Sequence, residues 1–170
     1  MNDFSDVIRT AIKMEQAGIN FYHEAAQKVY HPFGKKMLLS FVEDEEKHII
    51  ALKNILTELK IFDFDRFLKE KTPREKIKAI FEEVKSGTKR KILAHSNELK
   101  VLKVGMEIEL KSIEFYQSGL EKTQESHLKD FFKRLVEEEK EHYQMLQNTY
   151  SYLKDSRDWY LWEEKAILDG

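Results

Sequence analysis

The sequence contains an internal repeat. Shifting it by 94 residues aligns residues 7–60 with residues 101–154 without a gap, and 15 of the 54 aligned positions are identical. A match of this length indicates two copies of one supersecondary unit. Because 170 residues are enough for one domain with a sizeable core but short for two, we expect a single domain over 1–170 built from two similar halves.

Each copy has the pattern of a helical hairpin, because its apolar residues recur three and four positions apart. The stripes of the first copy are Ile8, Ile12, Ile19 and Tyr22, then Leu38, Phe41, Leu52, Ile55 and Leu59. Those of the second are Leu102, Met106, Ile113 and Tyr116, then Phe132, Leu135, Leu146 and Leu153. Four such helices must bury their stripes against one another, which predicts an all-α four-helix bundle.

The breaks between helices have recognisable turn chemistry. His31-Pro32-Phe33-Gly34 is expected to interrupt the first hairpin, and the second break falls near Thr123–Ser126, where Ser126 is suited to cap the next helix. We expect hairpin 1 at about 3–61, a crossover at 62–96, hairpin 2 at 97–154 and a tail at 155–170.

The crossover is too long for a tight turn and should carry its own short helix. Thr72-Pro73-Arg74-Glu75 is a capping box with proline at the first helical position, and the apolar residues after it continue to Ser86-Gly87. The tail contains Trp159-Tyr160-Leu161-Trp162, which is aromatic enough that we expect it to dock on the bundle or on a partner subunit.

Charged residues interrupt the apolar stripes at equivalent points of the repeat. Residues three apart share a helix face, so each Glu-x-x-His pair can reach one common centre. The six residues that fall on the stripes are Glu15, Glu45, His48, Glu109, Glu139 and His142. Glu-x-x-His pairs are common enough by chance that their position in the stripes, and not their number, is the evidence for a site.

Four buried carboxylates repel one another and are costly to desolvate. Two divalent cations would balance their charge, and two neutral imidazoles would complete the ligand set. Mixed oxygen and imidazole ligation suits iron or manganese, and zinc is a further possibility. The alternative is a metal-free bundle in which these residues are surface charges.

Other polar residues are interpreted more simply. Five glutamates lie off the stripes and are expected in solvent: Glu43, Glu46, Glu137, Glu138 and Glu141. Four histidines lack a glutamate three positions earlier and are not expected to bind metal: His23, His31, His95 and His127. Tyr22 and Tyr116 each follow a candidate ligand by seven residues, so they are either core aromatics or hydrogen-bond donors to ligand carboxylates.

Composition excludes several classes of function. The net charge of −2 does not favour nucleic-acid binding. The absence of cysteine excludes disulfides, thiolate zinc sites and a rubredoxin-type centre within these residues. Apolar runs are short, so we expect neither a transmembrane helix nor a secretory signal, and a cytoplasmic location is the expectation.

At the six stripe residues the sequence resembles the ferritin-like di-iron superfamily, in particular its rubrerythrin and bacterioferritin branches. The resemblance implies that Glu15 and His48 bind one iron. It implies that Glu109 and His142 bind the other. Glu45 and Glu139 would then bridge the two ions. Members react ferrous iron with oxygen or hydrogen peroxide, so the implied function is a di-iron oxidoreductase with an external electron donor.

Two positions depart from these branches. Rubrerythrins usually carry a further glutamate ligand three residues after the third-helix glutamate, where this chain has Ser112, and their peroxidase chemistry is associated with that carboxylate. Bacterioferritins have a haem-ligating methionine directly after the second-helix glutamate, where this chain has Glu46. The closest fit is therefore a stand-alone rubrerythrin-like protein without haem.

Three functions remain open alongside a structural bundle. The first is reduction of hydrogen peroxide or oxygen at a dinuclear centre, by a protein expected to be a homodimer. The second is ferroxidase or iron-storage activity, which requires a hollow oligomer. The third is hydroxylation of an organic substrate, as in the similar demethoxyubiquinone hydroxylases, although no membrane-facing apolar surface is evident.

Overall fold

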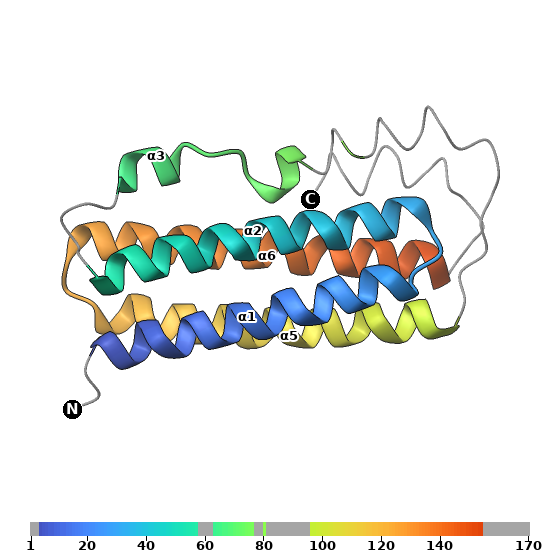
Figure 1. The fold of residues 1–170 in the computed structure, drawn as a ribbon, viewed down its shortest axis with the longest axis horizontal. Helices are drawn as coiled ribbons and strands as arrows, with labels where there is room; N and C mark the ends of the chain where they lie inside the picture. Colours follow the sequence, from blue (N-terminus) through green and yellow to red (C-terminus); the bar gives the residue numbers. More distant parts are fainter. Residues whose placement is uncertain (1–3, 58–62, 77–79, 81–95, 155–170) are drawn as a thin grey trace.

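The computed structural model describes residues 4–57, 63–76, 80 and 96–154. Its long helices are α1 (Phe4–Lys28), α2 (Pro32–Thr57), α5 (Ser96–Lys122) and α6 (Ser126–Lys154), and a short helix, α3 (Phe64–Leu68), follows α2. They run as two antiparallel hairpins, α1 with α2 and α5 with α6 (Figure 1). The predicted tail at 155–170 and most of the crossover lie outside the described residues.

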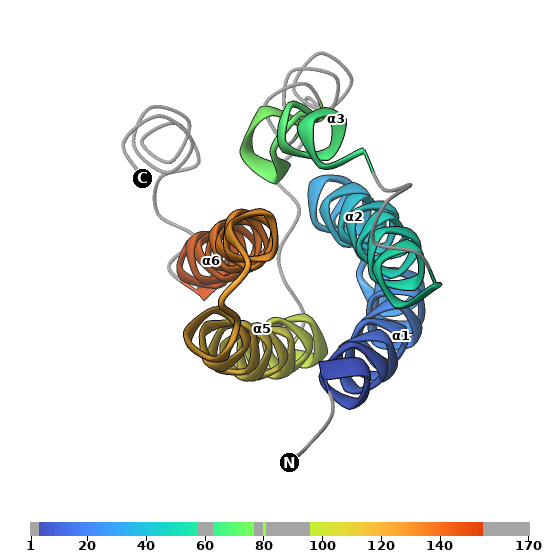
Figure 2. The same cartoon turned by 90° about the vertical axis from the view of Figure 1, so that its left-hand side faces the viewer.

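Viewed from the end, the four long helices surround a common centre (Figure 2). α1 packs against α2, α5 packs against α6, and the two hairpins also meet through α1 with α5 and α2 with α6. No strand occurs among the described residues. The prediction of an all-α four-helix bundle from two duplicated hairpins is confirmed.

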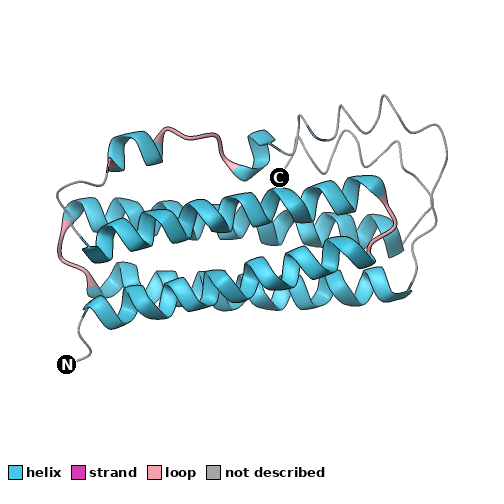
Figure 3. Cartoon of the chain, in the orientation of Figure 1, coloured by secondary structure: helices cyan, strands magenta, loops and turns pink. Residues whose placement is uncertain are grey.

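The connections within the hairpins are shorter than the sequence predicted (Figure 3). α2 already begins at Pro32, and the carbonyl of His31 accepts the first helical hydrogen bond from Lys35 N at 3.0 Å. The expected break at 31–34 was therefore wrong in extent, because proline at a first helical position has no amide to satisfy and its fixed φ suits a helix. Likewise α6 begins at Ser126, and the carbonyl of Glu125 accepts from Lys129 N, so Glu125 and not Ser126 occupies the capping position.

The crossover begins at one end of the bundle, where α2 stops, and α5 begins at the other end (Figure 1). The predicted capping box is present: Thr72 N donates to Glu75 Oε2 at 2.8 Å and Glu75 N donates to Thr72 Oγ1 at 3.3 Å. Residues 73–76 are helical after it. α3, which the sequence analysis did not predict, has Asp63 as its cap, whose carboxylate accepts from Arg66 N at 2.9 Å.

The apolar core is divided into two clusters along the bundle. One contains Tyr22, Phe41, Leu102 and Leu146, and the other contains Ile8, Leu52, Ile113 and Leu135, each with further members. Every long helix contributes to both clusters. Burying one such side chain contributes about 1.5–3 kcal/mol. The two clusters therefore fix the four helices relative to one another on both sides of the middle of the bundle.

Candidate metal centre

The six stripe residues lie between the two apolar clusters and are almost completely buried. Their exposed fractions range from 0 to 3%. α1 and α5 each contribute one glutamate, and α2 and α6 each contribute a glutamate and a histidine one turn apart. The bundle therefore brings together Glu15, Glu45, His48, Glu109, Glu139 and His142.

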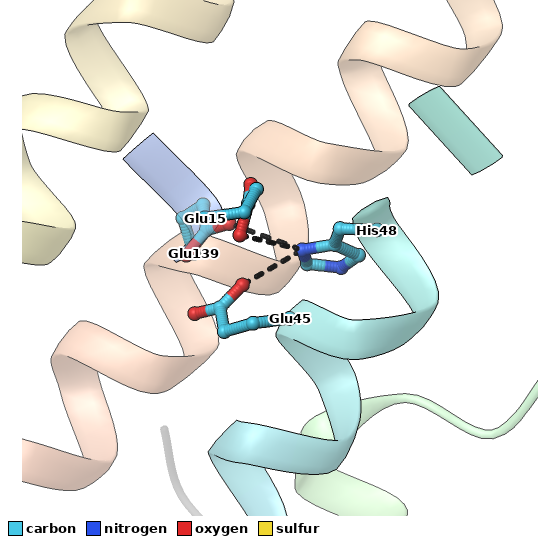
Figure 4. Close-up of side chains that lie close together, drawn as sticks. All are labelled: Glu15, Glu45, His48 and Glu139. Carbon is cyan, nitrogen blue, oxygen red and sulfur yellow. Dashed lines mark hydrogen bonds and ion pairs between the residues drawn. The ribbon is translucent and has the colours of Figure 1, made fainter. Parts of the chain in front are cut away.

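Four of these residues form a group around His48 (Figure 4). His48 Nδ1 lies 3.6 Å from Glu15 Oε2, 2.9 Å from Glu45 Oε2 and 3.4 Å from Glu139 Oε1. One donor atom from each of the four residues lies within 4.8 Å of the others. A single metal ion could bind all four atoms.

A second group surrounds His142. Its Nδ1 lies 3.6 Å from Glu45 Oε1, 3.8 Å from Glu109 Oε1 and 3.5 Å from Glu139 Oε2. The donor atoms of this group also lie within 4.8 Å of one another. The two groups are related by the 94-residue repeat.

Glu45 and Glu139 belong to both groups. Each directs one carboxylate oxygen toward His48 and the other toward His142. A carboxylate with its two oxygens in two adjacent donor sets has the geometry required to bridge two cations.

Two tyrosines connect the hairpins at the centre. Tyr22 OH donates to Glu109 Oε1, and Tyr116 OH donates to Glu15 Oε1. Both tyrosines are fully buried. The sequence placed each tyrosine on the same helix face as the glutamate seven residues earlier, but each hydroxyl contacts the corresponding glutamate of the opposite hairpin.

The outer nitrogen of each histidine faces a further carboxylate that the sequence analysis did not recognise. His48 Nε2 lies 2.9 Å from Glu138 Oε2, and His142 Nε2 lies 3.3 Å from Asp44 Oδ2. A carboxylate on Nε2 keeps the proton there and leaves the Nδ1 lone pair directed at the centre. The prediction that Glu138 is solvated was wrong, since it is 7% exposed; Asp44 is 1% exposed.

Each of these outer carboxylates is paired with a cation. Arg134 Nε pairs with Glu138 Oε1, and Lys76 Nζ pairs with Asp44 Oδ1. Asp44 and Glu138 are themselves 94 residues apart. The available signal in the sequence was an acidic residue directly before the stripe glutamate in both copies.

The carboxyl groups of Glu15 on α1 and Glu109 on α5 hold their protons tightly. Burial and the neighbouring Glu45 raise the pKa of Glu15 well above its ordinary value, and burial together with Glu139 does the same for the pKa of Glu109. Burial and the Glu109 carboxylate raise the pKa of Tyr22, so its phenol keeps its proton and remains a donor. The ionised form of this cluster thus requires positive charge nearby.

The pKa values of the two histidines are raised as well. Burial by itself lowers the pKa of His48, but the carboxylates around it outweigh burial and raise that pKa well above 6.5. Burial is likewise outweighed at His142, mainly by Glu139 and Glu109, which raise its pKa to about 9. Protons and metal ions therefore compete for the same atoms.

Several buried polar atoms in the centre have no hydrogen-bond partner in the described part of the chain. They are both carboxylate oxygens of Glu139, Oε2 of Glu109 and Nδ1 of His142. Buried polar atoms are nearly always satisfied, and orphaned ones need an explanation. Oxygen and imidazole nitrogen donors left free in this arrangement fit a divalent metal ion.

The remaining candidates lie apart from this centre. His23 and His127 are exposed, while His95 is outside the described residues. His31 is buried, but at the α1–α2 connection, against Tyr152. Glu43, Glu46 and Glu137 are exposed, as predicted, whereas Glu141 is only partly exposed and accepts a hydrogen bond from Arg74 N at 3.0 Å.

A helical bundle with paired carboxylate–histidine groups in its core is the architecture of the ferritin-like di-iron carboxylate proteins. The chain belongs to the rubrerythrin family, whose sequence profile matches residues 6–150. This match covers both hairpins and confirms the resemblance deduced from the stripe residues. Comparisons with curated proteins and with solved structures found no match.

Membership in this family indicates a di-iron carboxylate protein, and the buried carboxylate and histidine groups could hold a metal. No helix in the described ranges has a segment both long and apolar enough to span a membrane.

Proposed function

We propose that the protein is a non-haem di-iron oxidoreductase that reduces hydrogen peroxide or oxygen. The observation that carries the proposal is the orientation of Glu45 and Glu139, each with one oxygen toward His48 and the other toward His142. Glu15 and His48 would hold one iron, Glu109 and His142 would hold the other, and the two shared glutamates would bridge them.

The residues around the ions have distinct tasks in this proposal. The histidines would bind through Nδ1, because Nε2 of each is engaged by Glu138 or Asp44. The hydroxyl group of Tyr22 orients Glu109, and that of Tyr116 orients Glu15. When bound, two ferrous ions supply two electrons, the number that converts one hydrogen peroxide and two protons into two waters.

The electrons must be replaced by an external donor of unidentified nature, since the 170 residues contain no cysteine for a rubredoxin-type iron site. Manganese or zinc would fit the same donor atoms. Of these, zinc has no redox chemistry, so the native metal decides whether this reaction is possible.

Ferroxidase or iron-storage activity is the second candidate, because Ser112 weakens the expectation of peroxidase activity. Ser112 is 8% exposed, and neither candidate ligand group found among the described residues contains a further carboxylate. Rubrerythrins usually have that carboxylate at this position, and it is associated with their peroxidase chemistry. Storage requires a hollow oligomer of many subunits, whereas light scattering that gives a homodimer would exclude a cage.

Metal content tests the centre itself. Anaerobic titration of the metal-free protein with Fe(II) should reach two ions per chain. Replacing a bridging residue, in Glu45→Gln or Glu139→Gln, should reduce bound iron sharply, because one substitution affects both donor groups. Glu46→Gln and Glu137→Gln alter exposed neighbours and serve as matched controls. Unchanged iron content in both bridge variants would contradict the proposal.

Stopped-flow spectroscopy tests the oxidant. Diferrous protein should oxidise much faster with hydrogen peroxide than with an equal concentration of oxygen. Faster oxidation by oxygen, followed by growth of a mineral absorption band as more Fe(II) is added, would support the ferroxidase candidate instead.

A further inference from the structure

The duplication has left the two halves of the centre with different outer cations. On the His48 side, Glu138 pairs with Arg134, four residues earlier on the same helix. The repeat places Ser40 at the corresponding position of α2, and its hydroxyl donates to the Met37 carbonyl at 2.8 Å. Asp44 therefore has no equivalent cation on its own helix.

The crossover supplies the missing charge. Lys76 reaches from the crossover to Asp44 Oδ1, and its side chain is 17% exposed. The other oxygen of Asp44 faces His142 Nε2 at 3.3 Å. A continuous chain of contacts thus runs from Lys76 in the crossover through Asp44 to the imidazole ring of His142.

The backbone that carries Lys76 is ordered by a capping box of its own and anchored to the bundle by two hydrogen bonds. The Thr72–Glu75 capping box starts the helical turn at 73–76. Arg74 N donates to Glu141 Oε2 of α6 at 3.0 Å. Upstream, Arg134 Nη2 donates to the carbonyl of Glu70 at 3.1 Å. Residues 70–76 therefore lie over the outer face of α2 and α6 (Figure 2).

Removing the Lys76 charge should affect Asp44 first. A buried carboxylate that loses its cation is left uncompensated and turns toward solvent. Once turned away, it no longer accepts the hydrogen bond from His142 Nε2, so the ring loses the contact that selects its tautomer. Losing such an outer partner typically costs 10–100-fold in metal affinity.

We propose that Lys76 is a positioning residue for one of the two metal sites, so that docking of the crossover controls metal binding mainly on the His142 side, where Lys76 pairs directly with Asp44, and affects the His48 side less. The inference rests on the proposed dinuclear centre. It makes the two metal sites unequal although their ligands are related by the repeat.

The test is anaerobic titration of the metal-free full chain with Co(II), followed by its visible absorption. The unsubstituted protein should bind two equivalents. Lys76→Met, which keeps the length of the side chain, should bind one equivalent normally and the second at least tenfold more weakly. Lys76→Arg should restore the second equivalent, and Lys71→Met, at an exposed lysine of the same segment, should bind like the original protein.

A spectroscopic signature separates positioning from general stability. With histidine labelled with ¹⁵N and the protein loaded with Zn(II), the Nε2 proton of His142 should exchange slowly with solvent. In Lys76→Met it should exchange faster, while the rate of the Nε2 proton of His48 should change much less. Asp44→Ala, which removes the acceptor, should reproduce both effects, and adding it to Lys76→Met should cause little further loss, because both act through one contact.

Three results would overturn the inference: normal binding of both equivalents by Lys76→Met, equal weakening of both, or failure of Lys76→Arg to restore the second. Should Lys76→Met not fold, Asp44→Ala decides alone, since normal binding of both equivalents by that variant also overturns the inference. An unsubstituted protein that does not bind two equivalents would contradict the proposed function. If the unsubstituted protein binds two equivalents and Lys76→Met binds metal in the same way, only this inference is contradicted.

Discussion

Tyr22 on α1 donates its hydroxyl hydrogen bond to Glu109 on α5, across the boundary between the two hairpins. The repeat generates the reciprocal contact from Tyr116 to Glu15. Because the two hydrogen bonds link the hairpins directly at the centre, they join the packing of the bundle to the orientation of two candidate ligands.

Removing either hydroxyl should weaken both properties. In Tyr22→Phe or Tyr116→Phe, a buried carboxylate oxygen loses its donor, which should lower the free energy of unfolding by about 1–3 kcal/mol and weaken binding of Fe(II) or Co(II). Urea denaturation and metal titration measure the two effects. Tyr143→Phe is the control, since Tyr143 lies on α6 and contacts neither Glu15 nor Glu109 in the hydrogen bonds described above. Wild-type metal affinity in both variants would exclude a role for the tyrosines in ligand orientation.

The metal-free protein should become less stable as the pH rises from 6.5 to 9. The pKa values of Glu15, Glu109, His48 and His142 are all raised in the folded state, which therefore binds protons more tightly than the unfolded chain. For His142 alone, a pKa of about 9 against the ordinary 6.5 corresponds to roughly 3 kcal/mol. The lowered pKa of Glu138, about 2, adds a contribution that is already constant in this range.

Urea denaturation at several pH values in the presence of a chelator measures this dependence. Saturating Zn(II) should remove or reverse it, because the cation replaces the bound protons and gains affinity as they leave. If the stability of the metal-free protein instead increased with pH across this range, the raised pKa values would be wrong.

Glu98 should matter for stability and not for metal binding. Its buried Oε1 accepts hydrogen bonds from Tyr30 N at 2.6 Å and from His31 N at 2.9 Å, which fixes the start of α5 against the α1–α2 connection. Glu98→Ala should lower the free energy of unfolding by about 2 kcal/mol, whereas Glu98→Gln retains an acceptor and should cost less.

The measurement is thermal or urea unfolding, with Glu107→Ala as an exposed control on the same helix. Two equivalents of metal should still bind to both Glu98 variants. A loss of metal binding at native-like helix content would show that this end of the bundle influences the centre.

Arg134→Met should weaken metal binding mainly on the His48 side. Arg134 pairs with Glu138, which engages His48 Nε2, and it also donates to the Glu70 carbonyl. The substitution should therefore also loosen the crossover, with an expected second, smaller effect on the His142 side. In Zn(II)-loaded protein the His48 Nε2 proton should exchange faster than in the unsubstituted chain. A change confined to the His142 proton would contradict this assignment.

Much of the architecture follows from local patterns in the chain. The 94-residue repeat and the apolar stripes predict two hairpins, and the capping box at Thr72 predicts the helical turn that begins at Pro73. The helix start at Pro32 was misjudged by a few residues, because proline serves equally well in a turn and at the first position of a helix. The start at Ser126 was misjudged by one residue, since Glu125 takes the capping position. α3 was missed because five residues carry too little periodicity to recognise.

The inner residues of the centre could be identified from sequence because they interrupt stripes that must face the core. Asp44 and Glu138 could not, since they lie one residue away from the stripe, where side chains normally reach solvent. Their burial depends on the crossover covering the outer face of α2 and α6, which local periodicity does not report.

The sequence by itself determined the helices, their duplication and the six residues directed at the middle of the bundle, because each of these depends on spacing along one helix. Only the tertiary structure decided which atoms meet: the two oxygens of Glu45 and Glu139 divided between two histidines, the tyrosines crossing to the opposite hairpin, and Lys76 replacing the cation absent at Ser40. These contacts join residues far apart in the chain, and the packing of the two hairpins and the crossover establishes their distances.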